Sequence, residues 1–310
     1  MNSEKSEPAR FAAPSSTSLS GVGKLAMQQR RASQRNRVVT ELLRNRAAAV
    51  GVVFLTLILF LVIVGPSLIP HEPHTQILSE RLSPPSRDHW LGTDQNGRDV
   101  LARMAAGGRI SLFVGIAGTT GGLILGTTIG LSAGYFGGWF DHLVMRFIDV
   151  MYAFPGVLLA IMIVAVLGPS LWNLIIALAI WATPTLSRIV RSNVLSLKQR
   201  EFVEAARAVG AGHVRIMTRH LLLNTVSLII VYATLGVATA ILTAAALGFL
   251  GLGVQPPTPE WGAMLSDGRT VIRRAPYLTL FPGLAIFFTV LSLNFIGDAL
   301  RDASDPYSQR

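Results

Sequence analysis

A serine between two glycines is the first residue in this sequence whose setting suggests chemistry. Gly130-Leu-Ser132-Ala-Gly134 matches the spacing of a nucleophile elbow, in which a serine hydroxyl attacks a carbonyl carbon. Such a serine needs a general base to accept its proton. No histidine lies in the long apolar stretch around Ser132, and both glycines belong to a longer series with a spacing of four. A membrane-embedded serine hydrolase is therefore a disfavoured alternative.

Two histidines after the first apolar stretch raise the question of a metal site. His71-Glu72-Pro73-His74 is one residue short of the zinc-protease motif, and its proline disfavours the helix that this motif requires. The chain has no cysteine, which excludes thiolate metal ligands and disulfides. A solvated loop is the favoured interpretation, with a weak metal contact as the alternative, and no metal site is predicted.

The composition indicates the elements that must position these residues. Hydrophobic residues make up 51% of the 310 residues and charged residues only 14%, whereas about a quarter are charged in a soluble protein. Five stretches without Asp, Glu, Lys, Arg or His cover 155 residues: 47–70, 110–140, 150–187, 221–259 and 275–297. Apolar runs of this length cross a bilayer as helices. A soluble enzyme, a nucleic-acid binder and a β-barrel are thereby excluded.

These stretches predict an all-α, polytopic membrane protein with six transmembrane helices. Gly168-Pro169-Ser170 divides the third stretch into two helices, and Gly251 with the prolines at 256–259 ends the fourth. The first stretch is too long for the core of a signal peptide. The predicted helices cover 47–69, 111–133, 146–167, 171–189, 225–250 and 279–298.

Six helices place both termini on one side, and the basic residues indicate which side. Under this topology 19 Lys and Arg lie on the side of the termini and 8 on the other, which predicts cytoplasmic termini. The net charge of +10 then reflects the basic residues that orient the chain in the membrane. The predicted organisation is a disordered, basic tail (1–45), a first transmembrane helix (46–70), an extracytoplasmic loop (71–108), a core (109–299) with a cytoplasmic loop at 190–222 and an extracytoplasmic loop at 251–278, and a cytoplasmic C-terminus (300–310).

The second predicted helix carries a glycine at every fourth position, at 118, 122, 126, 130 and 134. This spacing keeps Gly118, Gly122, Gly126, Gly130 and Gly134 near one face over about 24 Å. Because glycine has no Cβ, a neighbouring helix can approach closely, which favours helix association in lipid. This face is therefore predicted to be a tight helix-packing site.

The apolar stretches lack the ionisable residues that an ion-coupled carrier uses as relays. Such a carrier, acting without an ATPase, remains the alternative function. The favoured interpretation is that energy comes from a partner that binds the basic loop before the fifth helix. A capping-box signal at Ser196–Gln199 precedes Phe202, Ala205, Ala206 and Val209 at helical spacing. Gly210 suits a left-handed C-terminal cap, and a second short helix follows at 213–222, so the loop is predicted to form a protruding knob.

The knob sequence resembles the EAA loop of permeases in ABC importers. The resemblance rests on Glu204-Ala-Ala206-Arg-Ala-Val-Gly210, followed by His220-Leu-Leu-Leu-Asn224. The dipeptide/oligopeptide/nickel permease group, and its second (C-type) subunit, is indicated by further matches at Leu91–Val100, Gly134–Trp139 with Arg146 and Asp149, Ala153–Pro155, Phe249–Gly262, Phe281–Ala285 and Gly297–Asp302. Together they cover about residues 40–306. One departure is Leu223, where the family usually has proline.

The resemblance implies the type I ABC importer permease fold in a bacterial inner membrane. It implies a non-enzymatic subunit that pairs with a homologous permease, two ATPase subunits and an extracytoplasmic solute-binding protein. Glu204, Ala205, Ala206, Gly210, His220 and Asn224 would form the ATPase-coupling loop. ATP and Mg²⁺ would bind to the partners, since Gly23-Lys24-Leu25 lacks the pattern of a phosphate-binding loop and no cofactor is expected in this chain. The substrate-binding residues and the solute, whether dipeptide, oligopeptide, nickel chelate or opine-like compound, are left open.

Overall fold

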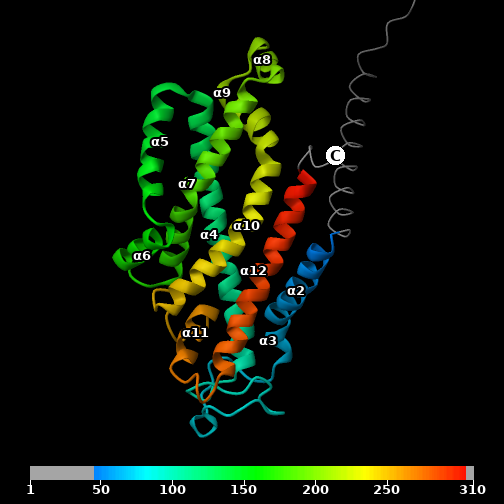
Figure 1. Cartoon of the computed structure of the whole chain (residues 1–310), viewed down its shortest axis with the longest axis vertical. Coiled ribbons are helices and arrows are strands. Elements are labelled where there is room, and N and C mark those ends of the chain that lie inside the picture. Colours follow the sequence, from blue (N-terminus) through cyan, green and yellow to red (C-terminus); the bar gives the residue numbers. More distant parts are fainter. Residues whose placement is uncertain (1–44, 305–310) are drawn as a thin grey trace, which may run out of the picture.

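A computed structural model describes residues 45–304, and in that range the chain is an elongated bundle of helices without a β-strand (Figure 1). This confirms the predicted all-α class. The helices are α2 (Arg46–Ile63), α3 (Gly65–Leu68), α4 (Val100–Phe136), α5 (Gly138–Ala153), α6 (Gly156–Leu167), α7 (Leu171–Lys198), α8 (Glu201–Ala208), α9 (His213–Arg215), α10 (Leu223–Phe249), α11 (Trp261–Arg269) and α12 (Tyr277–Ser304). A 3-10 turn, η1 (Leu78–Glu80), and a π-helical segment, η2 (Ile216–Leu222), complete the described elements.

Five of these helices are long and apolar enough to cross a membrane. They are α2, α4, α7, the continuous helix from His213 to Phe249, and α12, and the bent pair α5–α6 is a sixth if it counts as one crossing. The described helices thus give the predicted six crossings when the bent pair is counted as one. Residues 1–44 of the predicted tail and residues 305–310 lie outside the described part of the chain.

The third predicted helix, 146–167, is wrong as a single straight span. The chain forms α5 and α6 instead, and the two helices meet at an angle of 91° (Figure 1). Phe154 between them is extended, with φ −79° and ψ 135°, and Pro155 precedes the first residue of α6. Proline disfavours a helical conformation in the residue before it, so the apolar run turns at Phe154.

Three helices are longer than the helices predicted for them. The second predicted helix was to begin near 111, but α4 begins at Val100, where the Asp99 side chain accepts a hydrogen bond from the Ala102 amide at 2.7 Å. Arg109 therefore lies inside α4, and its guanidinium donates to the carbonyls of Val62 and Ile63 at 2.8 and 2.9 Å. Likewise, α7 continues to Lys198 and α12 to Ser304.

The predicted loop 251–278 contains a helix, α11, that the sequence analysis missed. Glu260 caps its start by accepting hydrogen bonds from the amides of Gly262 and Ala263, both at 2.9 Å, and the Ser111 hydroxyl of α4 donates to it at 2.9 Å. Burial raises the pKa of the Glu260 carboxyl, although these three donors act in the opposite direction. Trp261 is fully buried beside it, so α11 is fixed against α4.

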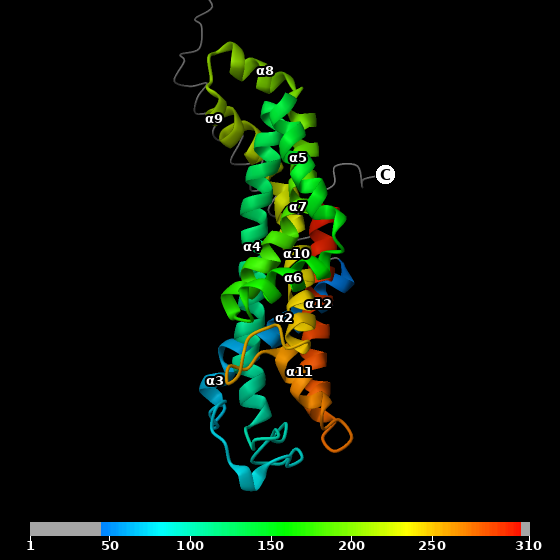
Figure 2. The same cartoon turned by 90° about the vertical axis from the view of Figure 1, so that its left-hand side faces the viewer.

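Residues 69–99 form an irregular segment at the end of the bundle opposite α8, here called the loop end (Figures 1 and 2). The Tyr277 hydroxyl of α12 donates to the carbonyls of Ser83 and Thr93 at 2.8 and 3.0 Å. His89 lies between Asp99 and Glu80, with nitrogen–oxygen distances of 2.8 and 3.1 Å. Burial alone would lower the pKa of His89, but the two carboxylates outweigh it and raise the pKa. The segment is thereby held over the start of α4.

Candidate coupling and packing sites

The predicted knob is present as α8, α9 and η2, which protrude at the end of the bundle opposite the loop end (Figures 1 and 2). Gly210 lies between α8 and α9 with φ +78°, a left-handed conformation that glycine adopts without strain. The predicted capping box is wrong, because Ser196 lies inside α7 and Arg200 is the N-cap of α8. We use "the knob" below for residues 201–222.

One face of α8 is buried against the bundle and the other is exposed. Val203 and Ala206 are 0% and 7% exposed, and they pack in an apolar cluster with residues of α4, α7 and η2. Glu204, Ala205 and Gly210 are exposed. Ala206, which the resemblance groups with Ala205 in the coupling loop, therefore faces the bundle, because the inward stripe of α8 begins at Val203 and recurs three residues later.

Tyr135, near the end of α4, connects the knob to the bundle. Its buried hydroxyl lies 2.8 Å from Nδ1 of His213 in α9, and its backbone carbonyl accepts a hydrogen bond from Lys198 Nζ at 2.5 Å. The Arg207 guanidinium of α8 lies 5.9 Å from the centre of its ring. Tyr135 falls within the motif Gly134–Trp139, which predicts no role for it, and only the fold brings it to residues more than 60 positions away.

His220 and Asn224 lie where the knob continues into α10. The His220 ring stacks on Phe202 of α8, with centroids 6.5 Å apart, and the Asn224 side chain donates to the His220 carbonyl at 2.5 Å. Leu223 is the first residue of α10 and has helical dihedrals, φ −61° and ψ −33°. The part of the knob that begins at His213 thus forms one continuous helix with α10.

The contact between Tyr135 and His213 has a testable contribution to stability. We expect Tyr135→Phe to lower the free energy of unfolding by about 1 kcal/mol, because it removes one partly buried hydrogen bond. His213→Ala and the double variant complete a mutant cycle, measured by thermal unfolding in detergent. The double variant should lose less than the sum of the single losses. Strictly additive losses would show that the two side chains do not interact.

Five of the glycines of α4, those at 118, 122, 126, 130 and 134, face α7. Each is buried, and a Cβ atom added at any of them would lie 2.5–2.9 Å from an atom of α7. From Gly118 to Gly134 the nearest α7 residues are, in order, Leu178, Ala182, Leu186, Ser187 and Val194. Real Cβ atoms do not approach this closely. The short separation of α4 and α7 therefore requires glycine, which has no side chain, at these five positions.

Ion pairs link α5 to α7 beside this contact. The Arg191 guanidinium donates to both carboxylate oxygens of Asp141 at 2.5 Å, and Arg188 donates to Asp149 at 2.6 Å. The Arg188 guanidinium also lies 4.1 Å from the centre of the Tyr152 ring. α5 is therefore attached to α7 by charge-assisted hydrogen bonds.

A cavity of about 270 Å³ opens between α4, α7 and α10, near the middle of α4. Its lining combines apolar groups with the side chains of Thr119, Trp181, Tyr232 and Thr239. The Thr119 hydroxyl is buried and has no hydrogen-bond partner among residues 45–304. The sequence offered no means of finding this cavity, because its walls come from three helices.

Comparison with known proteins gives consistent matches over most of the chain. Residues 126–308 match the family described as binding-protein-dependent transport system inner membrane component, and residues 33–85 match the N-terminal TM domain of oligopeptide transport permease C. The dipeptide transport system permease protein DppC of Alkalihalophilus pseudofirmus is 52% identical over 266 residues, covering 86% of this chain and 88% of that protein. The glutathione transport system permease protein GsiD of Pectobacterium atrosepticum is 46% identical over 265 residues, covering 85% and 88%.

A solved structure has the same fold at low sequence identity. The MetNI methionine ABC transporter, in inward-facing conformations, contains a chain that superposes with a TM-score of 0.52 and 17% identity. The match covers 66% of this chain and 97% of that chain. The helix arrangement is therefore that of a transmembrane chain from an ABC transporter.

Proposed function

The chain belongs to the family of binding-protein-dependent transport system inner-membrane components, and from this membership we propose that it is a permease subunit of an ATP-driven importer of short peptides. It forms one half of a translocation pathway across the bacterial inner membrane, and separate ATPase subunits supply the energy. The observation that carries this proposal is the knob, which presents Glu204 and Ala205 outward and is anchored to α4 and α7 from within.

Coupling starts at the exposed face of the knob. An ATPase that binds Glu204, Ala205 and Gly210 displaces the knob when it closes on ATP. Val203 and Ala206 pass this displacement to the apolar cluster, and the His213–Tyr135 contact passes it to α4. Because the glycine series holds α4 against α7, the two helices move together, and the cavity beside them changes its access.

The partners follow from the same role. One homologous permease supplies the other half of the pathway, two ATPase subunits bind ATP and Mg²⁺, and a solute-binding protein delivers the solute at the loop end. This chain itself hydrolyses no ATP and binds no nucleotide. Its two termini and the knob lie in the cytoplasm, in accord with the excess of Lys and Arg on that side.

Short peptides are the proposed solutes. The two relatives with 52% and 46% identity are permeases for a dipeptide and for glutathione, so closely related chains serve small peptide solutes. The cavity between α4, α7 and α10 suits part of such a pathway, because it combines apolar walls with the hydroxyls of Thr119 and Tyr232. Those hydroxyls can exchange hydrogen bonds with a passing peptide group.

Reconstitution separates this function from an ion-coupled carrier. We expect liposomes that contain this chain with its homologous permease, the ATPases and the binding protein to accumulate labelled dipeptide only when ATP is supplied to the ATPase side. An ion gradient without ATP should give no accumulation. Uptake by this chain alone, driven by a proton or sodium gradient, would contradict the proposal.

The role of the knob predicts a specific uncoupled variant. Glu204→Lys reverses a charge on the exposed face of α8, and we expect it to lower ATP-driven dipeptide uptake at least about tenfold, because an interface that loses charge complementarity associates more slowly and binds more weakly. Thermal stability should be unchanged. Glu204→Gln removes the charge without reversing it and should retain more uptake than Glu204→Lys. Uptake by Glu204→Lys equal to that of the original chain would remove Glu204 from the coupling site.

A further inference from the structure

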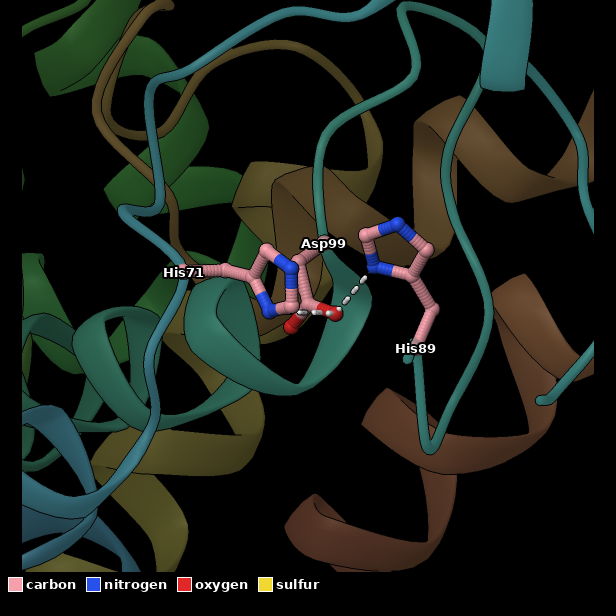
Figure 3. Close-up of side chains that lie close together, drawn as sticks. All are labelled: His71, His89 and Asp99. Atoms are coloured by element: carbon pink, nitrogen blue, oxygen red, sulfur yellow. Dashed lines mark hydrogen bonds and ion pairs between the residues drawn. The ribbon is translucent and has the colours of Figure 1, made fainter. Parts of the chain in front are cut away.

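Two histidines and an aspartate meet at the loop end, where α4 begins (Figure 3). His71 comes from the segment after α3, His89 from the segment before α4, and Asp99 is the N-cap of α4. Figure 3 shows the two rings on opposite sides of the Asp99 carboxylate. Their centroids lie 4.5 Å apart, and one ligand atom from each of the three residues lies within 4.8 Å of the other two.

We propose that His71, His89 and Asp99 form a binding site for a divalent transition-metal ion of the zinc class. Two imidazole nitrogens and a carboxylate oxygen are ligands that zinc prefers, and three protein ligands leave one coordination position for water. The proposal rests on this cluster and is independent of the transport function.

The distances suit a tetrahedral ion. Asp99 Oδ2 lies 2.8 Å from His89 Nδ1 and 3.9 Å from His71 Nδ1. A zinc ion with bonds of about 2.0–2.1 Å holds its ligand atoms roughly 3.3 Å apart, and the two measured distances lie on either side of this value. Along these two edges of the tetrahedron the ligand atoms need to move by only roughly half an ångström.

The remaining atoms of the ligands are already oriented by other groups. The second nitrogen of His89 lies 3.1 Å from Glu80 Oε2, which is the carboxylate–histidine arrangement that fixes the ring of a metal ligand. The other oxygen of Asp99 accepts the Ala102 amide, so Oδ2 is the oxygen that faces the two rings. A structural N-cap needs only one of these oxygens, and the second is available to an ion.

The surroundings admit a hydrated cation. The cluster borders a cavity of about 500 Å³ whose lining includes the carboxylates of Glu80, Asp88 and Asp99 against the single guanidinium of Arg87. The side chain of His71 is 33% exposed, whereas that of Asp99 is 3% exposed, so His71 is the ligand next to solvent. A bound ion would tie the segment after α3 to the start of α4.

The test uses the full chain in lipid nanodiscs, purified with a tag that contains no histidine and freed of metal with a chelator. Zinc is then titrated, with bound metal measured by mass spectrometry and Tm by calorimetry. We expect one equivalent of Zn²⁺ at micromolar or lower concentration and a higher Tm. His71→Ala should weaken binding at least about tenfold and abolish the zinc-dependent rise in Tm, because it removes a ligand.

A matched control lies three residues away. His74 is exposed on the same segment and lies outside the cluster, so His74→Ala should bind zinc as the original chain does. Because His71 caps no helix, the metal-free Tm of His71→Ala should equal that of the original chain. An equal Tm would show that the variant folds. The proposal is overturned if the original chain takes up no stoichiometric zinc, if His71→Ala binds zinc with unchanged affinity, or if His74→Ala loses binding as His71→Ala does.

Discussion

Replacing Gly126 with leucine is expected to prevent α4 from packing against α7 and to leave little folded protein. A Cβ at Gly126 would already lie 2.6 Å from the Cβ of Leu186 and 3.2 Å from the backbone of α7, so the helices must separate before the leucine fits. Overpacking a core costs about 1–3 kcal/mol and sometimes more. Because the obstacle here includes backbone, we expect at least about 3 kcal/mol. Tm in detergent and the yield of monodisperse protein measure the loss.

The matched change is Thr120→Leu, which adds a leucine at an exposed position of the same helix. It should leave Tm within a few degrees of the original value, whereas Gly126→Ala should fall between the two leucine variants. A graded series of this kind would assign the loss to the contact with α7 and not to hydrophobic substitution in α4 as such. If Gly126→Leu melts at the original temperature, the glycine face does not set the separation of α4 and α7.

The glycine face could be predicted from the sequence, but its partner could not. A spacing of four places five residues on one side of a helix whatever the rest of the chain does. Which helix lies against them depends on how α4 and α7 meet in space, and no local pattern near Leu186 or Ser187 marks those residues as the opposing surface. The periodicity therefore locates the contact surface on α4 but does not identify the helix that packs against it.

The missed elements have a common physical cause. Counting uncharged residues measures how much chain can lie in lipid, but it does not report the direction of that chain, so the turn at Phe154–Pro155 was overlooked. The same count assigns α11 to a loop, because its sequence includes Asp267 and Arg269. The position of α11 depends on tertiary contacts, such as the hydrogen bond that the Trp261 indole N–H donates to the Met104 carbonyl at 3.0 Å.

The knob shows the limit of local reasoning within a single site. Gly210 was identified correctly as a left-handed cap, because glycine at the end of a short amphipathic segment has that local meaning. The inward position of Ala206 and the contact of Tyr135 with the knob could not be predicted from the local sequence. Both depend on α4, which lies more than 60 residues earlier in the chain and forms the surface on which α8 rests.

These contacts order the proposed coupling path from one end to the other. We propose that the exposed face of α8 receives the ATPase; Tyr135 and the apolar cluster join the knob to α4, and the glycine face joins α4 to α7. Since close-packed contacts transmit displacement with little loss, the weakest point of such a path is the turn that orients α8. That turn depends on one residue, Gly210.

Gly210→Pro is expected to uncouple transport while the helix bundle stays folded. Proline fixes φ near −65°, but Gly210 has φ +78°, and its amide donates to the Arg207 carbonyl at 2.9 Å, a bond that proline cannot make. The turn must therefore reorganise, and α8 loses its orientation. We expect ATP-driven dipeptide uptake in proteoliposomes to fall at least about tenfold, with membrane insertion unchanged.

Gly212→Pro is the matched control for this variant. Gly212 lies two residues further along the same loop and has φ −67°, the value that proline requires, and a Cβ there meets open space. The two variants thus introduce the same residue into the same loop, and the substituted positions differ in the sign of φ and in the hydrogen bond that the Gly210 amide donates to Arg207. Uptake should be retained in Gly212→Pro and lost in Gly210→Pro. Loss in both would mean that the loop tolerates no proline, and normal uptake in Gly210→Pro would show that the orientation of α8 does not control transport.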